Sequence, residues 1–154
     1  MDIKIEKIQS ADIPEINRIQ KLAFKESYDK YHFCPAYETT DEQIMSYFEK
    51  TEIDIYKIIT SNQIIGSAYV YIMGNNHYEL DTITINPIYQ NTGIGTKVME
   101  LIENNYTEAL QWSLQTPETD SRNRHFYEKL GYTQVGSRYI NQSLNLILYK
   151  KENK

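Results

Sequence analysis

Cysteine is nearly absent from the sequence, which contains only Cys34 among its 154 residues. A single thiol forms no intramolecular disulfide, so the chain is not a disulfide-stabilised scaffold. The histidines, His32, His77 and His125, lie far apart, and no Cys/His set has the spacing of metal ligands. We therefore expect no bound metal.

Long apolar runs and dense basic segments are missing as well. No apolar run is long enough to span a bilayer, and the first residues lack the apolar core of a secretion signal. The net charge is −5 and the basic residues are scattered, whereas a nucleic-acid-binding protein needs a basic face. These absences predict a cytoplasmic protein without a membrane or nucleic-acid partner.

Tyrosine, in contrast, is abundant, with 14 residues in a chain whose length suggests a single domain over 1–154. A tyrosine has a large apolar ring and a polar tip, which suits pockets for polar organic ligands. The same rings could equally be structural, so composition leaves both interpretations open.

Hydrophobic periodicity and capping signals predict alternating strands and helices. The first helix has the clearest start, because Asp12 is an N-cap acid that precedes Pro14 and Glu15. A capping box at Thr40–Gln43 starts a short second helix, and the preceding residues 30–39 are expected to be irregular. The expected helices are roughly 13–29, the short one after Thr40, 92–105 and 120–130, and the expected strands are roughly 3–8, 53–60, 63–73, 78–86, 109–114, 132–139 and 144–149. This β-α-α-β-β-β-α-β-α-β-β order predicts an α/β fold with a mixed sheet and helices on its faces.

The most informative segment is 83–95, where a strand ends at Pro87 and a short turn carries Gly93 and Gly95 before a helix begins. Free backbone N–H groups at a helix start attract anions, and glycines let a phosphate approach closely. The segment therefore predicts a phosphate or pyrophosphate site, with a purely structural strand-to-helix turn as the alternative. A dinucleotide fingerprint would need glycine at Val98, and the glycines of a P-loop lie further apart.

Two segments together resemble the GNAT acetyltransferase superfamily. The turn matches motif A of that superfamily, Gln/Arg-x-x-Gly-x-Gly/Ala, at Gln90, Gly93 and Gly95. Residues 123–132, Asn-Arg-His-Phe-Tyr-Glu-Lys-Leu-Gly-Tyr, resemble motif B, in which Phe-Tyr-Glu-Lys-x-Gly-Phe/Tyr is typical. The resemblance in element order covers essentially the whole chain. It implies a GNAT-type mixed, mostly antiparallel twisted sheet of about six or seven strands, flanked by about four helices.

The resemblance also implies an acetyl-CoA-dependent N-acetyltransferase, in which a primary amine attacks the thioester directly in a ternary complex. The pyrophosphate would rest on the loop amides, and the pantetheine arm would pair like an extra strand with the strand before the loop. The chain departs from many members at Asn91, where they have glycine, and at Asp120, where they have asparagine, so either Asp120 or Asn123 could contact the cofactor. The residues implied to bind acetyl-CoA are Ile83, Thr84, Ile85, Gln90, Asn91, Thr92, Gly93, Ile94, Gly95, Thr96, Asp120, Asn123, Phe126 and Tyr127.

Acetyl transfer to an amine calls for a base and an acid. Tyr127 matches the family tyrosine that lies near the sulfur and is the candidate acid; its alternative role is core packing beside Phe126. Glu79 lies eleven residues before Gln90, as in members that use a glutamate base, and Asp81 shares its strand face. The alternative is a solvated strand face with an ordered water as the base.

In the resembled family, the first two helices and their connection shape the acceptor site. That region is aromatic in this sequence, and it could stack on a substrate, surround an ammonium group or close the edge of the core. The candidate substrate-binding residues are Tyr28, Tyr31, Phe33 and Tyr37. The acceptor would be a small-molecule or peptide amine, and the C-terminal strands could support a homodimer.

Two other functions remain open from the sequence. A non-catalytic acyl-CoA-binding sensor would keep the loop and lack the acid and base. An interaction module would bind no nucleotide, and the glycine turn would then be structural.

Overall fold

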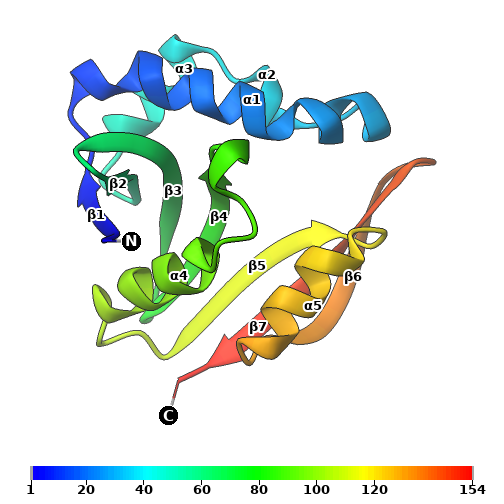
Figure 1. Cartoon of the computed structure of the whole chain (residues 1–154). Helices are drawn as coiled ribbons and strands as arrows, with labels where there is room; N and C mark the ends of the chain where they lie inside the picture. Colours follow the sequence, from blue (N-terminus) through cyan, green and yellow to red (C-terminus); the bar gives the residue numbers. More distant parts are fainter. Residues whose placement is uncertain (1, 154) are drawn as a thin grey trace.

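The computed structural model describes residues 2–153 and contains one seven-stranded sheet with five α-helices (Figure 1). The strands are β1 (Lys4–Lys7), β2 (Ile53–Thr60), β3 (Gln63–Gly74), β4 (His77–Ile85), β5 (Gln111–Pro117), β6 (Thr133–Asn141) and β7 (Leu144–Glu152). The helices are α1 (Ile13–Tyr31), α2 (Pro35–Glu38), α3 (Asp41–Phe48), α4 (Ile94–Asn104) and α5 (Ser121–Lys129). Two 3-10 turns, η1 (Ser10–Asp12) and η2 (Pro87–Tyr89), precede α1 and follow β4.

The strands lie in the order β1-β2-β3-β4-β5-β7-β6. Every neighbouring pair is antiparallel except β4–β5, which is parallel. Parallel neighbours need a crossover connection, and α4 supplies it here. The predicted mixed, mostly antiparallel sheet is therefore confirmed.

The parallel pair β4–β5 separates along its length. The two strands pair at only three positions, the last of which is Glu79↔Ser113. Beyond it, β4 continues to Ile85 along β3, and β5 continues to Pro117 along β7, so the two strands diverge in a V (Figure 1). A bulge at Asp81 interrupts the pairing of β4 with β3 just past the start of the V, where a local bend is expected.

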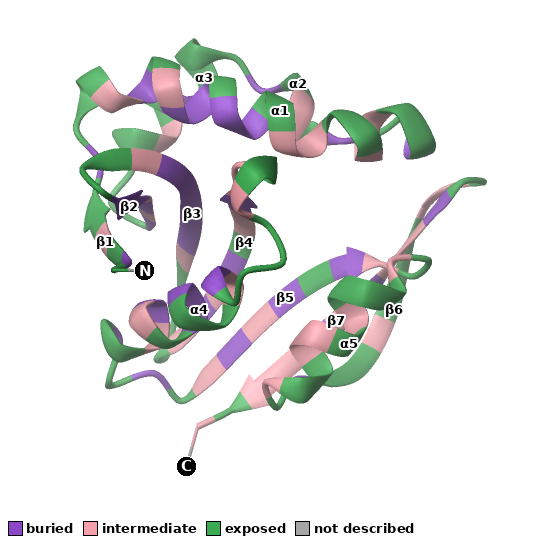
Figure 2. Cartoon of the chain, in the orientation of Figure 1, coloured by how far each residue is buried: buried purple, intermediate pink, exposed green. Residues whose placement is uncertain are grey.

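Helices cover both faces of the sheet. On one face, α4 buries Ile94, Val98 and Ile102, which recur every four residues, and packs them with Tyr78 and Trp112 of the sheet. The opposite face carries α1 and α3, whose apolar residues share a second cluster with the sheet: Ile13, Ile16, Ile44, Ile55 and Tyr69. In Figure 2, buried residues occur along α1, β3 and β5.

The structure departs from the expected elements after α1 and at β5. The segment 30–39, expected to be irregular, instead continues α1 to Tyr31 and forms the short α2, so there are five helices and not about four. Pro35 begins α2, at a position where a helix needs no N–H from it. The strand expected at about 109–114 is shifted to 111–117, because its polar end pairs with β7 to the last residue.

Candidate active site

The turn between β4 and α4 is held by two left-handed residues. Asn91 has φ 64° and Gly93 has φ 80°, and Gly93 is the N-cap of α4. A Cβ at Gly93 would meet no atom within 4 Å, so glycine is needed there for its backbone angle and not for space. The Thr92 hydroxyl donates to the Tyr89 carbonyl at 2.6 Å and fixes the turn from within. The first N–H groups of α4 lie at the open end of this turn, where a helix has no partners for them.

A cavity of about 580 Å³ lies against this turn. Its walls come from the second half of α1, the end of β4, the glycine turn and the first part of α5. The predicted cofactor residues that line it are Ile83, Thr84, Ile85, Gln90, Asn91, Gly93, Ile94, Gly95, Thr96, Asp120, Asn123, Phe126 and Tyr127. Thr92 belongs to the same predicted set but is not a lining residue. The fold thus brings two distant sequence motifs to one cavity.

The last residues of β4 offer a free backbone edge to this cavity. Asn86 donates its N–H to the Ile65 carbonyl at 2.7 Å, and the Thr84 carbonyl lies against Gly66, so both residues face β3. Successive residues of a strand direct their backbone groups to opposite neighbours. Ile83 and Ile85 therefore face the gap, where β5 no longer pairs with β4.

Gln90 completes this edge. Its side-chain amide donates to the Ile85 carbonyl at 3.3 Å and ties the turn to the end of β4. The groups left facing the gap are the N–H and carbonyl of Ile83 and the N–H of Ile85. The expectation that Ile83, Thr84 and Ile85 all pair through their backbones is thus too broad, because the backbone of Thr84 faces β3.

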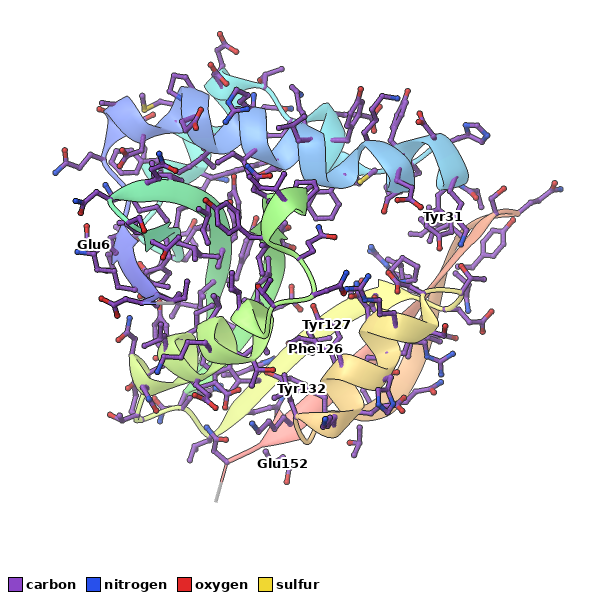
Figure 3. All side chains as sticks on the ribbon, in the orientation of Figure 1. Glu6, Tyr31, Phe126, Tyr127, Tyr132 and Glu152 are labelled. Atoms are coloured by element: carbon purple, nitrogen blue, oxygen red, sulfur yellow. The ribbon has the colours of Figure 1, made fainter. Side chains whose placement is uncertain are left out.

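Phe126 and Tyr127 form the α5 side of the cavity, between α5 and α4 (Figure 3). A Cβ at Gly95 would lie 3.2 Å from Phe126 Cζ, so the second glycine of the turn makes room for that ring. Tyr127 packs edge-on against Phe126 and Tyr132, with ring centroids 5.2 Å and 6.1 Å away. Burial, with a smaller effect from the charge of Asp120, raises the pKa of Tyr127 to about 12. Tyr127 therefore keeps its proton at neutral pH.

Asp120 and Asn123 both line the cavity but have different local roles. The Asp120 carboxylate accepts the backbone N–H of Asn123 at 3.0 Å and caps α5. This cap explains why an acidic residue is tolerated where the resembled family has asparagine. The Asn123 side chain has no role in the cap.

Glu79 and Asp81 lie beside the V and are not among the residues that line the cavity. Glu79 is the cross-strand partner of Tyr71, and Tyr71 packs into the cluster beneath α1 and α3. The Glu79 side chain is therefore on the face of the sheet that α1 and α3 cover. Ser113 donates to Glu79 at 3.3 Å, and burial, followed by the charge of Asp81, raises the pKa of Glu79. Asp81 is exposed as a residue, but neighbouring protein atoms exclude water from part of its carboxyl group, and this desolvation raises the pKa of that carboxyl as well.

Of the four aromatic residues predicted to bind the acceptor, only Tyr31 lines the cavity. Its hydroxyl is 2.6 Å from that of Thr119, so the end of α1 is linked to the loop before α5 (Figure 3). Tyr28 and Tyr37 stack on each other, with ring centroids 4.6 Å apart, and Phe33 is exposed. These three rings therefore do not line the cavity.

Several lining residues gave no signal in the sequence. Ala23, Phe24, Ser27 and Lys30 come from α1, and Arg122 comes from α5. Their proximity depends on how α1 crosses the sheet, which helical periodicity does not specify. Lys30 and Arg122 bring two positive charges to the cavity lining, and Glu26 and Asp120 bring two negative ones.

The acetyltransferase (GNAT) family model matches residues 14–132. The chain belongs to the GNAT acetyltransferase family. The matched region contains α1, the glycine turn and α5, and therefore every wall of the cavity. Comparison with curated protein sequences gives no match.

Solved structures similar to this chain include other GNAT enzymes. The PaiA N-acetyltransferase from Thermoplasma acidophilum, in complex with coenzyme A, gives a TM-score of 0.83 at 18% identity, over 99% of this chain and 100% of that one. The ribosomal-protein-S18-alanine N-acetyltransferase from Escherichia coli gives 0.78 at 15% identity, over 98% and 94%. A spermidine N-acetyltransferase SpeG chimera from Vibrio cholerae and hSSAT gives 0.79 at 12% identity, over 99% and 96%. At these identities the likeness supports the fold.

Three further features bear on partners. Within residues 2–153, no helix combines the length and apolarity needed to cross a membrane. The same residues contain no group of three or more His, Cys, Asp or Glu side chains arranged to hold a metal ion. The edge strand β6 exposes two large apolar side chains, Val135 and Tyr139, at 58% and 70%.

Proposed function

We propose that this protein transfers an acetyl group from acetyl-CoA to a primary amine, by direct attack in a ternary complex. The observation that carries the proposal is the free edge of β4 at Ile83 and Ile85, which leads directly into the glycine turn and the start of α4. An extended arm with amide groups can pair with such an edge as an added strand does. An anionic group next to that arm then meets a helix N-terminus.

The residues of the cavity fit both parts of the cosubstrate. The N–H groups from Gly93 to Thr96 are suited to the pyrophosphate, and Lys30 and Arg122 add favourable charge beside it. Ile83 and Ile85 are suited to the pantetheine arm. Acetyl-CoA would supply an activated thioester, and the chain would supply orientation and proton transfer.

Tyr127 is proposed as the hydrogen-bond donor to the leaving sulfur. Its phenol lines the cavity and stays protonated at neutral pH, because burial raises its pKa to about 12. So weak an acid stabilises a thiolate chiefly by donating a hydrogen bond to it. The same phenol in water would be hydrated and less well oriented.

Glu79 is proposed as the base, acting directly or through a water, with Asp81 as the alternative. Glu79 lies at the point of the V where β4 and β5 separate, on the face covered by α1 and α3. Its raised pKa makes the carboxylate a better proton acceptor than an exposed glutamate. The amine is therefore expected to approach from the α1 side, opposite α4.

The proposal is tested by thermal unfolding of the protein with acetyl-CoA, coenzyme A, NAD or ATP. A ligand at about 100 times its Kd adds about 2.7 kcal/mol of stability, which corresponds to about 5–10 °C in Tm for a domain of this size. We expect that shift with both coenzyme A species and not with NAD. An amine panel with thiol release as the readout then separates small amines from peptide N-termini as acceptors.

The remaining outcomes are also decisive. No shift with millimolar coenzyme A would contradict the proposal and favour an interaction module. A shift without thiol release from any amine would favour a non-catalytic acyl-CoA sensor.

A further inference from the structure

A chain of side-chain contacts links Glu79 to a histidine on the same strand. Ser113 donates to the Glu79 carboxylate at 3.3 Å, and its hydroxyl oxygen lies 2.9 Å from His77 Nε2. β4 and β5 pair at these positions, His77 with Gln111 and Glu79 with Ser113. The three side chains therefore share one face of the sheet, at the end of the V where the strands are still paired. Such contacts are often long without substrate and tighten when it binds.

His77 connects this chain of contacts to a second cavity, of about 480 Å³. This cavity opens at the surface, since Met73 and Leu110 in its lining are 52% and 58% exposed. It shares no lining residue with the cavity beside the glycine turn, and Glu79 lines neither of them. His77 thus gives Glu79 a connection to solvent that does not pass through the proposed acetyl-CoA site.

Glu79 needs such a connection once it has taken a proton from the amine. Burial, followed by the charge of Asp81, raises the pKa of Glu79, while the positive charges of His77 and Arg138 lower it. The side chain is partly buried, and bound substrates would cover it further. Each turnover nevertheless has to return the carboxylic acid to the carboxylate, because only the carboxylate accepts a proton.

The two residues beyond Glu79 are of the types that pass protons on. A serine hydroxyl has one proton to donate and accepts through its oxygen, so Ser113 can release one proton as it receives another. A neutral imidazole with Nε2 unprotonated accepts a proton there, and histidine exchanges protons with water near neutral pH. The Gln111 side-chain nitrogen lies 3.3 Å from His77 Nε2 and can donate to it in this unprotonated form.

We propose that Ser113 and His77 form a proton relay that returns Glu79 to the carboxylate after each acetyl transfer. This assignment rests on the proposed function, in which Glu79 is the base. An amine N–H bond breaks and its proton binds the Glu79 carboxylate. That proton then moves to Ser113 Oγ while the Ser113 hydroxyl proton moves to His77 Nε2, which leaves a carboxylate, a hydroxyl and an imidazolium.

The imidazolium releases one proton to water in the second cavity, and exchange with water restores the starting tautomer. Neither Ser113 nor His77 touches the substrate in this scheme, since both act through Glu79.

The test is His77→Ala, assayed by thiol release with and without imidazole. We expect kcat to fall about 10-fold or more, but less than the drop of about 100-fold expected for Glu79→Gln, because the base itself remains. Imidazole should restore kcat, since it fits the space of the missing ring and accepts the proton. Pyrazole has the same size and shape but is a far weaker base, and it should not restore kcat. The KM for acetyl-CoA should not change, because His77 does not line that cavity.

Variants of Ser113 test the middle of the relay. Ser113→Ala removes the hydroxyl and should lower kcat as His77→Ala does, without restoration by imidazole. Ser113→Thr keeps a hydroxyl and should retain most of the wild-type kcat. His125→Ala is the matched control, because His125 is exposed on α5 and lines neither cavity. Its kinetics should equal those of the wild type with and without imidazole.

An unchanged kcat in His77→Ala would overturn the relay and leave Glu79 as a base that exchanges directly with water. A loss that imidazole does not restore, or that pyrazole restores equally, would overturn it as well, because that pattern means a structural role. Wild-type kinetics in Glu79→Gln would remove the base and the relay together. If no amine leads to thiol release, the proposed function itself fails.

Discussion

Tyr127 has a partly buried ring that packs against the core and also lines the cavity, so its hydroxyl can be tested separately from its packing. Tyr127→Phe keeps the edge-on contacts with Phe126 and Tyr132. We expect kcat to fall about 100–1000-fold, the range for a lost hydrogen-bond donor to developing negative charge, while the KM for acetyl-CoA changes by less than about 3-fold. Steady-state kinetics with thiol detection measures both.

The control for this prediction is Tyr139→Phe on β6, where the side chain is 70% exposed and does not line the cavity. It should retain wild-type kinetics. Wild-type kcat in Tyr127→Phe would remove the donor role and leave Tyr127 as a core residue.

If Glu79 is the base, kcat/KM should depend on pH, and the environment of Glu79 sets the direction of that dependence. A base works only when deprotonated, so kcat/KM should fall as the pH drops through the pKa of Glu79, which burial and Asp81 raise above 4.5. Asp81→Asn removes the second of these causes and should move the acidic limb to lower pH. Glu79→Gln should lower kcat/KM by about 100-fold or more and abolish that limb.

The profile of kcat/KM against pH distinguishes the candidate bases. An acidic limb that persists in Glu79→Gln and disappears in Asp81→Asn would assign the base to Asp81. A limb unchanged in both variants would assign it to neither carboxylate.

At the scale of elements, the two glycines of the turn are required for different reasons. Gly93→Ala puts a Cβ on a residue with φ 80° in open space, which costs about 1–2 kcal/mol and about 2–8 °C in Tm. Gly93→Asn should cost less, because asparagine tolerates this conformation, as Asn91 does in the same turn. Gly95 has no such backbone requirement.

Gly95→Ala acts through the neighbouring helix. Its Cβ would lie 3.2 Å from the Phe126 ring, so the ring has to move away by a few tenths of an ångström. We expect a loss of Tm that Phe126→Leu partly restores in the double variant, as a double-mutant cycle in thermal unfolding would show. Additive effects would mean that the two residues act independently.

The sequence predicted the elements well where the signals are local. The Thr40–Gln43 capping box is formed as expected, with both reciprocal hydrogen bonds, and α3 begins directly after its N-cap residue Thr40. It did not predict α2 or the positions of Tyr28, Phe33 and Tyr37, because a four-residue helix has no periodicity to detect. Nor did it show that β4 and β5 separate after Glu79, since the length over which two strands pair is a tertiary property.

At the scale of the whole molecule, two contacts join the parts that the V separates. On one side the Tyr31 and Thr119 hydroxyls are 2.6 Å apart, and on the other Phe126 packs on Gly95. One contact links α1 to the loop before α5, and the other links α5 to α4. Tyr31, Thr119, Gly95 and Phe126 all line the cavity. The sequence motifs identified the parts of the lining that come from β4, the glycine turn and α5, but not the α1 residues or the contact between Tyr31 and Thr119.

The free edge of β4 has a further consequence. An unpaired strand edge normally invites another polypeptide to add to the sheet, which is a route to aggregation. Here the edge at Ile83 and Ile85 lines a cavity between α1 and α5, and a second polypeptide strand would need space for side chains on both of its faces. We therefore expect this edge to favour a ligand that has the hydrogen bonds of a strand without its bulk.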